Sequence, residues 1–346
     1  MPEDEPIISI AFARAGLLGN PSDGYYGKAI GISVRDFRAV VKLKEAPTLR
    51  FLPSAEDQRI EFDSMEQFAN HIENFGYYGG LRLIKATVKR FHVWCRDRIE
   101  ISSKTFEIQY QTNIPRSVGL AGSSAIVTAT LKALRRFYRV SIPNDVLASL
   151  TLSVEKDLLG ISAGLMDRVV QSFEGMVFMD FSKDTMQIKD GVSVGKYESL
   201  PPTPCEANFF LAWARDAAEP TEILHNRLQE RYRQGDDDVV EAMNQFAEFA
   251  EQGKLAIEKN DLPQLTTLID ANFDLRKAIC KLPSLHQKMV SVARQAGGSA
   301  KFCGSGGAII GTLSDPETFQ SVQTALRTIG CNVIQPTVRA VETIDD

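Results

Sequence analysis

The sequence predicts an α+β protein built from two domains. Short strand-like runs and amphipathic helical stretches are mixed in the first half of the chain, and the second half repeats this mixture on a smaller scale. Residues 192–204 lie between the halves and contain Gly195 and three prolines, which interrupt regular structure. We therefore place the join near residues 186–205 and expect domains at residues 1–190 and 191–346.

In the first half, apolar and β-branched runs predict strands, and apolar residues at helical spacing predict helices that cover them. The expected strands are residues 7–12, 30–43, 48–52 and 106–112, and a loop rich in Gly, Pro and Asn is expected at residues 16–27. The expected helices are residues 64–74, 80–97, 123–138 and 146–159.

The second half reads as a small α+β sandwich. A strand is expected at residues 209–214, followed by several amphipathic helices between residues 221 and 295. Further strands are expected at residues 300–303, 308–313 and 333–338, with a helix at residues 316–328 between the last two.

Composition excludes several classes of function. The formal net charge of −5, with basic residues scattered along the chain, gives no electrostatic surface for nucleic acid. The acidic N-terminal residues are unlike a secretory signal, so we expect a cytoplasmic protein that is not bound to a membrane. The five cysteines contain no C-x-x-C pair, and the four histidines are far apart, so a metal should arrive with a nucleotide.

The sharpest motif is a loop of small residues that follows a strand and opens an apolar helix. Its backbone N–H groups, together with the positive end of the helix dipole, suit a phosphate. The loop comprises Pro115, Arg116, Ser117, Val118, Gly119, Leu120, Ala121, Gly122, Ser123, Ser124 and Ala125. Ser123 or Ser124 is then placed to hold magnesium. The alternative is a serine-capped helix after a turn.

Other glycine-containing motifs are less specific. No Gly-Lys pair has the spacing of a Walker loop. The loop that contains Gly304, Ser305 and Gly306 is either a second backbone clamp for phosphates or substrate, or a flexible hairpin turn. A G-x-S-x-G motif is centred on Ser162, but a helix precedes it and no histidine follows within sixty residues, which argues against a serine hydrolase.

Two carboxylates flank the turn that contains Gly164. Asp167 lies twelve residues after Glu155, so one is placed to take a proton from a hydroxyl group and the other to hold a divalent ion. Arg14, near the N-terminus, is a candidate for the cation that keeps Asp167 ionised and neutralises charge in the transition state. The alternative is that both carboxylates are solvated charges at helix ends.

In this order, residues 13–23, 115–125 and 301–308 resemble the three signature segments of the GHMP kinases. Four stretches also resemble the plant-type glucuronokinases: Gly-Leu-Leu-Gly-Asn-Pro-Ser-Asp at 16–23, Gly-Tyr-Tyr-Gly-Gly at 76–80, Thr-Asn-Ile-Pro-Arg at 112–116, and Met-Asp-Phe-Ser-Lys at 179–183. The resemblance implies an N-terminal domain like ribosomal protein S5 domain 2 and a ferredoxin-like C-terminal domain, with the site between them.

The resemblance also implies a role for each matched residue. Asp167 would be the general base, and Arg14 would lie beside the transferred phosphoryl group. Ser123 and Glu155 would be magnesium ligands, and residues 115 and 119–125 would bind the ATP phosphates. The substrate-binding set would be Arg14, Asn20, Asp23, Gly164, Asp167, Arg168, Gly304, Ser305 and Gly306. Galactokinases have a glutamine at the position of Arg168, so Arg168 either contacts an acidic substrate or makes a structural salt bridge.

The implied reaction uses ATP and Mg²⁺ to phosphorylate D-glucuronate at its anomeric oxygen, giving D-glucuronate 1-phosphate for UDP-glucuronate formation. Asn20 replaces a glutamate of galactokinases and would donate to the sugar carboxylate, with Arg168, Lys28, Arg82 and Arg215 as the other candidates. The alternative is that Asn20 only shapes the turn before Pro21.

The rival functions are a kinase for galacturonate, arabinose or a heptose, and a catalytically silent sugar sensor on the same fold. Partners would be small molecules only, with the chain a monomer or homodimer.

Overall fold

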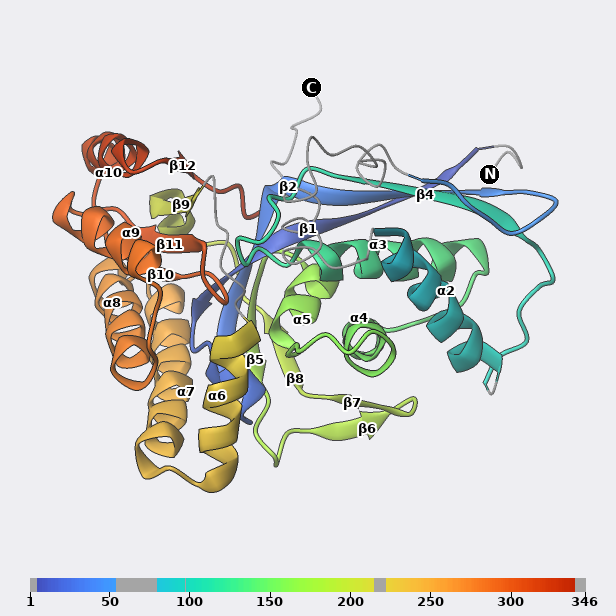
Figure 1. Cartoon of the computed structure of the whole chain (residues 1–346), viewed down its shortest axis with the longest axis horizontal. Helices are drawn as coiled ribbons and strands as arrows, with labels where there is room; N and C mark the ends of the chain where they lie inside the picture. The colour runs from blue at the N-terminus through green and yellow to red at the C-terminus, as the bar shows by residue number, and fades with distance from the viewer. Residues whose placement is uncertain (1–4, 54–79, 97, 215–221, 340–346) are drawn as a thin grey trace, which may run out of the picture.

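The fold is known from a computed structural model that describes residues 5–53, 80–96, 98–214 and 222–339, with residues 222–227 described for the backbone alone (Figure 1). The helix expected at residues 64–74 lies outside this range, as do Arg215 and most of the Gly-Tyr-Tyr-Gly-Gly stretch. The described residues form mixed helices and sheets, which confirms the α+β prediction.

The first half is a sheet covered on one face by helices. Its strand order is β3-β4-β2-β5-β8, and β1 pairs with β2 in antiparallel fashion. The strands are β1 (Ile7–Leu18), β2 (Lys28–Glu45), β3 (Arg50–Phe51), β4 (Phe106–Thr112), β5 (Met176–Asp180) and β8 (Lys196–Ser199). The helices are α2 (Gly80–Arg96), α3 (Gly122–Phe137), α4 (Asn144–Ser153) and α5 (Met166–Phe173), and α3 and α5 contact β1 and β2 directly (Figure 1).

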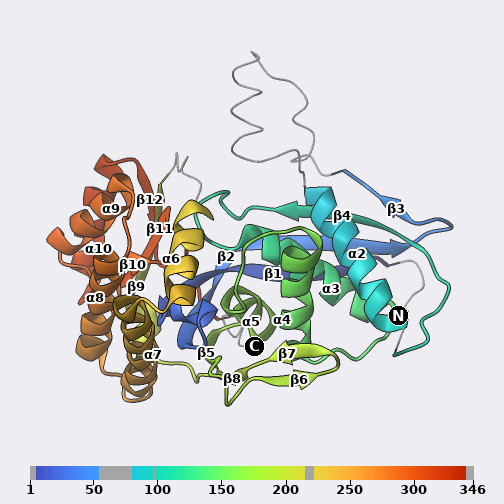
Figure 2. The same ribbon diagram turned by 60° about the horizontal axis from the view of Figure 1, so that its bottom comes forward.

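The second half contains a four-stranded sheet of order β10-β11-β9-β12. Its strands are β9 (Phe209–Ala214), β10 (Lys301–Phe302), β11 (Ala308–Thr312) and β12 (Cys331–Ile334). Its helices are α6 (Glu222–Gln234), α7 (Asp237–Glu258), α8 (Leu262–Ile279), α9 (Ser284–Gln295) and α10 (Pro316–Thr328). Because α7 packs on β1 and β2, and α8 packs on β1, β10 and β11, the two halves are joined at β1 (Figure 2).

Several elements match the sequence predictions residue for residue, namely β4, β9 and α10. The loop expected from Gly16 onward is wrong at its start, because β1 continues to Leu18 and pairs with β2 at Gly16↔Gly31 and Leu18↔Ile30. The expectation that residues 192–204 lack regular structure is also wrong. They contain the end of a hairpin, β6 (Gln187–Lys189) and β7 (Val192–Val194), and then β8.

The β6–β7 hairpin turns at Asp190-Gly191, and both residues have positive φ. Asp-Gly in this conformation is a common two-residue hairpin turn, so the sequence did carry the signal. The three prolines of the region lie after β8 in the passage to β9, where the chain crosses from one sheet to the other. The division into domains at residue 190 stays a prediction.

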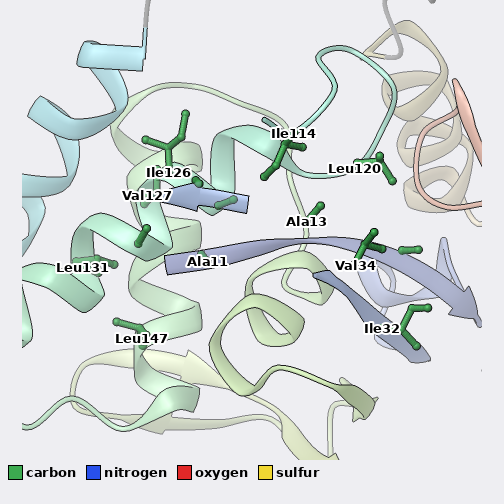
Figure 3. Packing of buried hydrophobic residues seen from close by; sticks show 14 of the residues in the cluster. Ala11, Ala13, Ile32, Val34, Ile114, Leu120, Ile126, Val127, Leu131 and Leu147 are labelled. Carbon is green, nitrogen blue, oxygen red and sulfur yellow. The ribbon is translucent and has the colours of Figure 1, made fainter. Parts of the chain in front are cut away.

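The main apolar core fixes the small-residue loop to β1. Ala11 and Ala13 of β1 and Val127 and Leu131 of α3 are fully buried, and Figure 3 shows them packed together. Ile114 and Leu120, on either side of the loop, reach into the same core and are 4% and 1% exposed. The loop therefore has a defined position. Within the described residues, no helix is both long and apolar enough to cross a membrane.

Candidate functional site

The three motif segments meet in space, although they are about a hundred residues or more apart in the chain. The backbone N–H of Gly16 donates to the carbonyl of Cys303 at 2.7 Å, and the N–H of Arg14 donates to the carbonyl of Leu120 at 3.3 Å. A Cβ added to Gly119 would lie 2.7 Å from the carbonyl oxygen of Gly306. The absence of a side chain at Gly119 is thus what lets the small-residue loop and the third loop touch.

The small-residue loop presents the N-terminus of α3 without a side-chain cap. Ala121 occupies the N-cap position in the left-handed region, with φ 62°, and the structure has no capping hydrogen bond there. The serine-capped alternative therefore does not describe this helix, since Ser123 and Ser124 lie within its first turn. The first-turn N–H groups of an uncapped helix need an outside acceptor, and an anion meets that need.

Arg14 and Asp167 form the centre of the site. Nε of Arg14 donates to Oδ1 of Asp167 at 2.6 Å, and Nη1 donates to the carbonyl of Gly119 at 2.6 Å. Arg14 is buried on β1, whereas the Asp167 side chain, in the first turn of α5, keeps 17% of its surface exposed. One guanidinium group thus ties the carboxylate to the loop that opens α3.

Glu155 lies in a π-helical turn, Val154–Leu158, that follows α4. It is fully buried and accepts from the Oγ of Ser123 at 2.8 Å, while its other oxygen accepts from Nε of Arg168 at 2.7 Å. Nη1 of Arg168 also bonds Asp167 at 3.1 Å and the carbonyl of Gly164 at 2.8 Å. Arg168 is therefore engaged in salt bridges, and it links the two carboxylates that the sequence singled out.

Ser123 and Glu155 offer two oxygen donors side by side, and Ser123 is partly exposed. Ser124 differs, because it is fully buried and its Oγ bonds the carbonyl of Ala121 at 3.2 Å. No group of three or more His, Cys, Asp or Glu that suits a metal occurs in the part of the chain that the structure describes. A pair of oxygens fits Mg²⁺ that arrives on a nucleotide, since this ion is usually held by one or two protein ligands plus phosphates and water.

Asp23 follows β1 in a short turn and faces Gly164, where an added Cβ would lie 2.9 Å from its Oδ2. Desolvation raises the pKa of Asp23 to about 7, and the negative charge of Asp167 adds to this shift. The side chain is only partly exposed, and it borders the same space as Asp167. Asp23 is therefore a carboxyl group that changes charge near neutral pH within the site.

Asn20 is 3% exposed and is held through both its backbone and its side chain. Its carbonyl accepts from Nδ2 of Asn272 at 3.1 Å, and its Oδ1 accepts from Nζ of Lys301 at 2.5 Å. An ammonium group only donates, so this contact fixes which amide atom is oxygen and leaves the N–H₂ group on the opposite side. Asn20 is thus oriented by a buried lysine that sequence reasoning missed.

Two buried cations of the second half, Lys301 and Arg276, complete the surroundings. Nζ of Lys301 also donates to the carbonyls of Gly16 and Phe302, at 2.9 Å each, and desolvation lowers its pKa to about 7. Nη1 of Arg276 donates to the carbonyl of Gly304 at 2.7 Å. The sequence signal for both cations is a charged residue at a position where the pattern calls for an apolar one. Lys301 interrupts an apolar strand, and Arg276 continues the buried face of α8 after Phe273.

Among the described residues, the other basic candidates for binding a sugar carboxylate already have partners, and the glycines of the third loop pack against Arg14 and His286. Lys28 pairs with Glu251 and Asp180, and Nη2 of Arg82 on α2 bonds the carbonyl of Leu159 at 3.2 Å. Gly304 lies against Arg14, because an added Cβ would be 3.0 Å from Nη2 of that arginine. Gly306, with φ 138°, packs on the ring of His286.

Sequence comparison finds two plant relatives that carry the name of the same enzyme. The GHMP kinases N-terminal domain matches residues 82–175. The chain is 41% identical to "Probable glucuronokinase 2" of Arabidopsis thaliana over 87% of its own length and 82% of that protein. It is 38% identical to "Glucuronokinase 1" of the same plant over 87% of its length and 83% of that protein.

Solved structures with the same fold share much less sequence. Lactococcus lactis galactokinase complexed with galactose superimposes with a TM-score of 0.72 at 17% identity, covering 96% of this chain and 94% of that one. Methanococcus jannaschii mevalonate kinase gives a TM-score of 0.65 at 20% identity, covering 95% and 97%. The structural similarity to these two enzymes establishes the two-domain fold. Evidence for the activity comes from the plant relatives, which share far more sequence.

Proposed function

The chain belongs to the glucuronokinase family of the GHMP kinases and is a sugar kinase, and on this premise we propose that it transfers the γ-phosphoryl group of ATP to the anomeric oxygen of D-glucuronate. The products are D-glucuronate 1-phosphate and ADP. The sugar 1-phosphate is the form that a nucleotidyltransferase needs to make UDP-glucuronate.

The observation that carries this proposal is the Arg14–Asp167 pair beside the uncapped N-terminus of α3. In phosphoryl transfer the protein has mainly to position the reactants and neutralise charge. The first turn of α3 binds the phosphates of ATP. Asp167, whose carboxylate is held by Arg14, orients the anomeric hydroxyl group and accepts its proton, while the guanidinium group of Arg14 faces the charge that builds up on the transferred group.

Magnesium is proposed at Ser123 and Glu155, with Ser123 rather than Ser124 as the hydroxyl ligand because Ser124 is buried and bonded to Ala121. When bound, the ion screens the negative charge of the nucleotide phosphates. Ser123 and Glu155 would each supply one oxygen to the ion, and Arg168 keeps the Glu155 carboxylate paired. The sugar lies between Asp167 and Asn20, with Asp23 against one face.

A screen for ADP release tests the proposal, with D-glucuronate, D-galacturonate, L-arabinose, a heptose and D-glucose as acceptors in the presence of ATP and Mg²⁺. We expect D-glucuronate to give the highest kcat/KM. A preference for a neutral sugar would refute the assignment of the substrate. Binding of sugar and ATP without ADP release would instead indicate a sensor built on a kinase fold.

A further inference from the structure

Arg276 is a buried arginine that has no carboxylate partner among the described residues. Its side chain extends from α8, and the residue is 6% exposed. Nη1 bonds the carbonyl of Gly304, and the guanidinium group lies 5.4 Å from the centre of the Phe302 ring. Nε is buried with no hydrogen-bond partner, and Arg276 makes no ion pair with any residue in the described ranges. Burying a cation without a counter-charge costs free energy, so this arrangement needs an explanation.

The position of Arg276 connects it to the reacting centre through one residue. Gly304 lies against the Nη atoms of Arg14, at 3.0 and 3.1 Å from the position of an added Cβ, and its carbonyl binds Arg276. Asp23 interacts electrostatically with both Asp167 and Arg276, so it lies near both. Arg276 is therefore close to the reacting centre, one residue removed from Arg14 through Gly304.

The free edge of the guanidinium group has the right shape for a carboxylate. Arginine binds a carboxylate most strongly through two parallel N–H donors, and the Nε–Nη2 edge is one of the edges that can do so. Because Nη1 of Arg276 is occupied by Gly304, this edge is the one that remains. Asp23 does not neutralise it below pH 7, since the raised pKa of Asp23 keeps that carboxyl group mostly uncharged there.

We propose that Arg276 binds the C6 carboxylate of the uronic acid, and that Asn20, held by Lys301, donates to the same carboxylate. This inference rests on the proposed function and names the determinant of its acidic substrate. In a hexuronate ring, C1 and C5 both flank the ring oxygen, so the anomeric oxygen and the carboxylate lie on adjacent parts of the sugar. A sugar whose anomeric oxygen faces Asp167 would therefore present its carboxylate only a short distance away.

A comparison of D-glucuronate with D-glucuronamide tests the pairing, because the amide has the same shape and no charge. The variants are Arg276→Gln, which can keep the bond to Gly304, and Arg276→Lys, which keeps the charge without the two-pronged edge. Lys277→Gln is the control, since it removes one positive charge from the next, exposed position of α8. Melting temperature and the KM for ATP are measured for each protein.

We expect the wild type and Lys277→Gln to prefer glucuronate over the amide by about tenfold to a hundredfold, the usual strength of a hydrogen-bonded charged pair. Arg276→Gln should bring this ratio close to one with little change in the KM for ATP, and Arg276→Lys should give an intermediate ratio. Equal losses on both substrates would overturn the inference and make Arg276 an anchor for the Gly304 loop. A wild type inactive on every uronate would refute the proposed function itself. If Arg276→Gln does not fold, an unchanged ratio in Arg276→Lys overturns the pairing.

Discussion

The charge of the sugar site is predicted to change near pH 7 through two groups, and Asp23→Asn isolates the contribution of one of them. Below pH 7 Asp23 is mostly neutral and Lys301 mostly charged, whereas above pH 7 the reverse holds, since both groups have pKa values of about 7. Both changes make the site more positive as pH falls. An acidic sugar should therefore bind more tightly at pH 6 than at pH 8.

The size of the effect follows from two energies. A carboxylate of the substrate about 4 Å from an ionised Asp23 would be repelled by about 4 kcal/mol at an effective dielectric constant near 20. Protonating a group one pH unit above its pKa costs only about 1.4 kcal/mol. The site should therefore take up a proton when the uronate binds. Because this uptake becomes harder as pH rises, the KM should increase about tenfold between pH 6 and pH 8 for each of the two groups.

The assay is the KM for D-glucuronate at half-unit steps from pH 6 to pH 8, with D-glucuronamide as the uncharged control. Arginine side chains stay charged over this range, so the contribution of the arginines around the site is constant. Asp23→Asn should remove about a tenfold share of the rise, while the KM for the amide should change little with pH in either protein. A profile that is identical in wild type and Asp23→Asn would refute the reasoning.

Asp167→Asn should reduce sugar-dependent ADP formation by about two to four decades with nearly normal ATP binding, and near-normal turnover would remove Asp167 as the base. Ser123→Ala should weaken the response of the rate to Mg²⁺ more than sugar affinity, and an equal effect of Ser124→Ala would contradict the choice between them. Asn20→Glu should lower kcat/KM for glucuronate by roughly ten- to a thousandfold and for neutral hexoses much less, so a uniform loss would make Asn20 a turn residue. Asp23→Asn should raise the melting temperature at pH 8 but not at pH 4. A raised carboxyl pKa makes folding lose stability as pH rises from about 4 to about 7, so equal shifts at both pH values would refute the link.

Much of the fold was predictable because its signals are local. The alternation of β4 and the Pro and Asp residues that open α10 are read within a few residues, and both elements match the prediction. The extent of β1 was not, because residues 16–18 are Gly-Leu-Leu and follow strand geometry only through their pairing with β2 and the bond from Gly16 to Cys303. Long-range pairing of this kind has no local trace.

The candidate site divides in the same way. Arg14, Asp167, Ser123 and Glu155 stand in motifs, and the structure brings them together as two hydrogen-bonded pairs joined by Arg168. The buried cations Lys301 and Arg276 were missed. Lys301 stands at the edge of the third signature segment, Arg276 belongs to no motif, and both lie about 260 residues or more from Arg14 in the chain. Only the burial of a charged residue on an apolar face marked them, and burial is a property of the folded chain.

The most direct test of the central claim is the structure of the sugar product. Wild-type protein is incubated with ATP, Mg²⁺ and D-glucuronate labelled with ¹³C at C1, and the product is examined by ¹³C and ³¹P NMR. The account predicts a single sugar phosphate in which C1 is coupled to phosphorus and the reducing end is lost. A product that keeps its reducing end, with phosphorus coupled to another carbon, would contradict transfer to the anomeric oxygen.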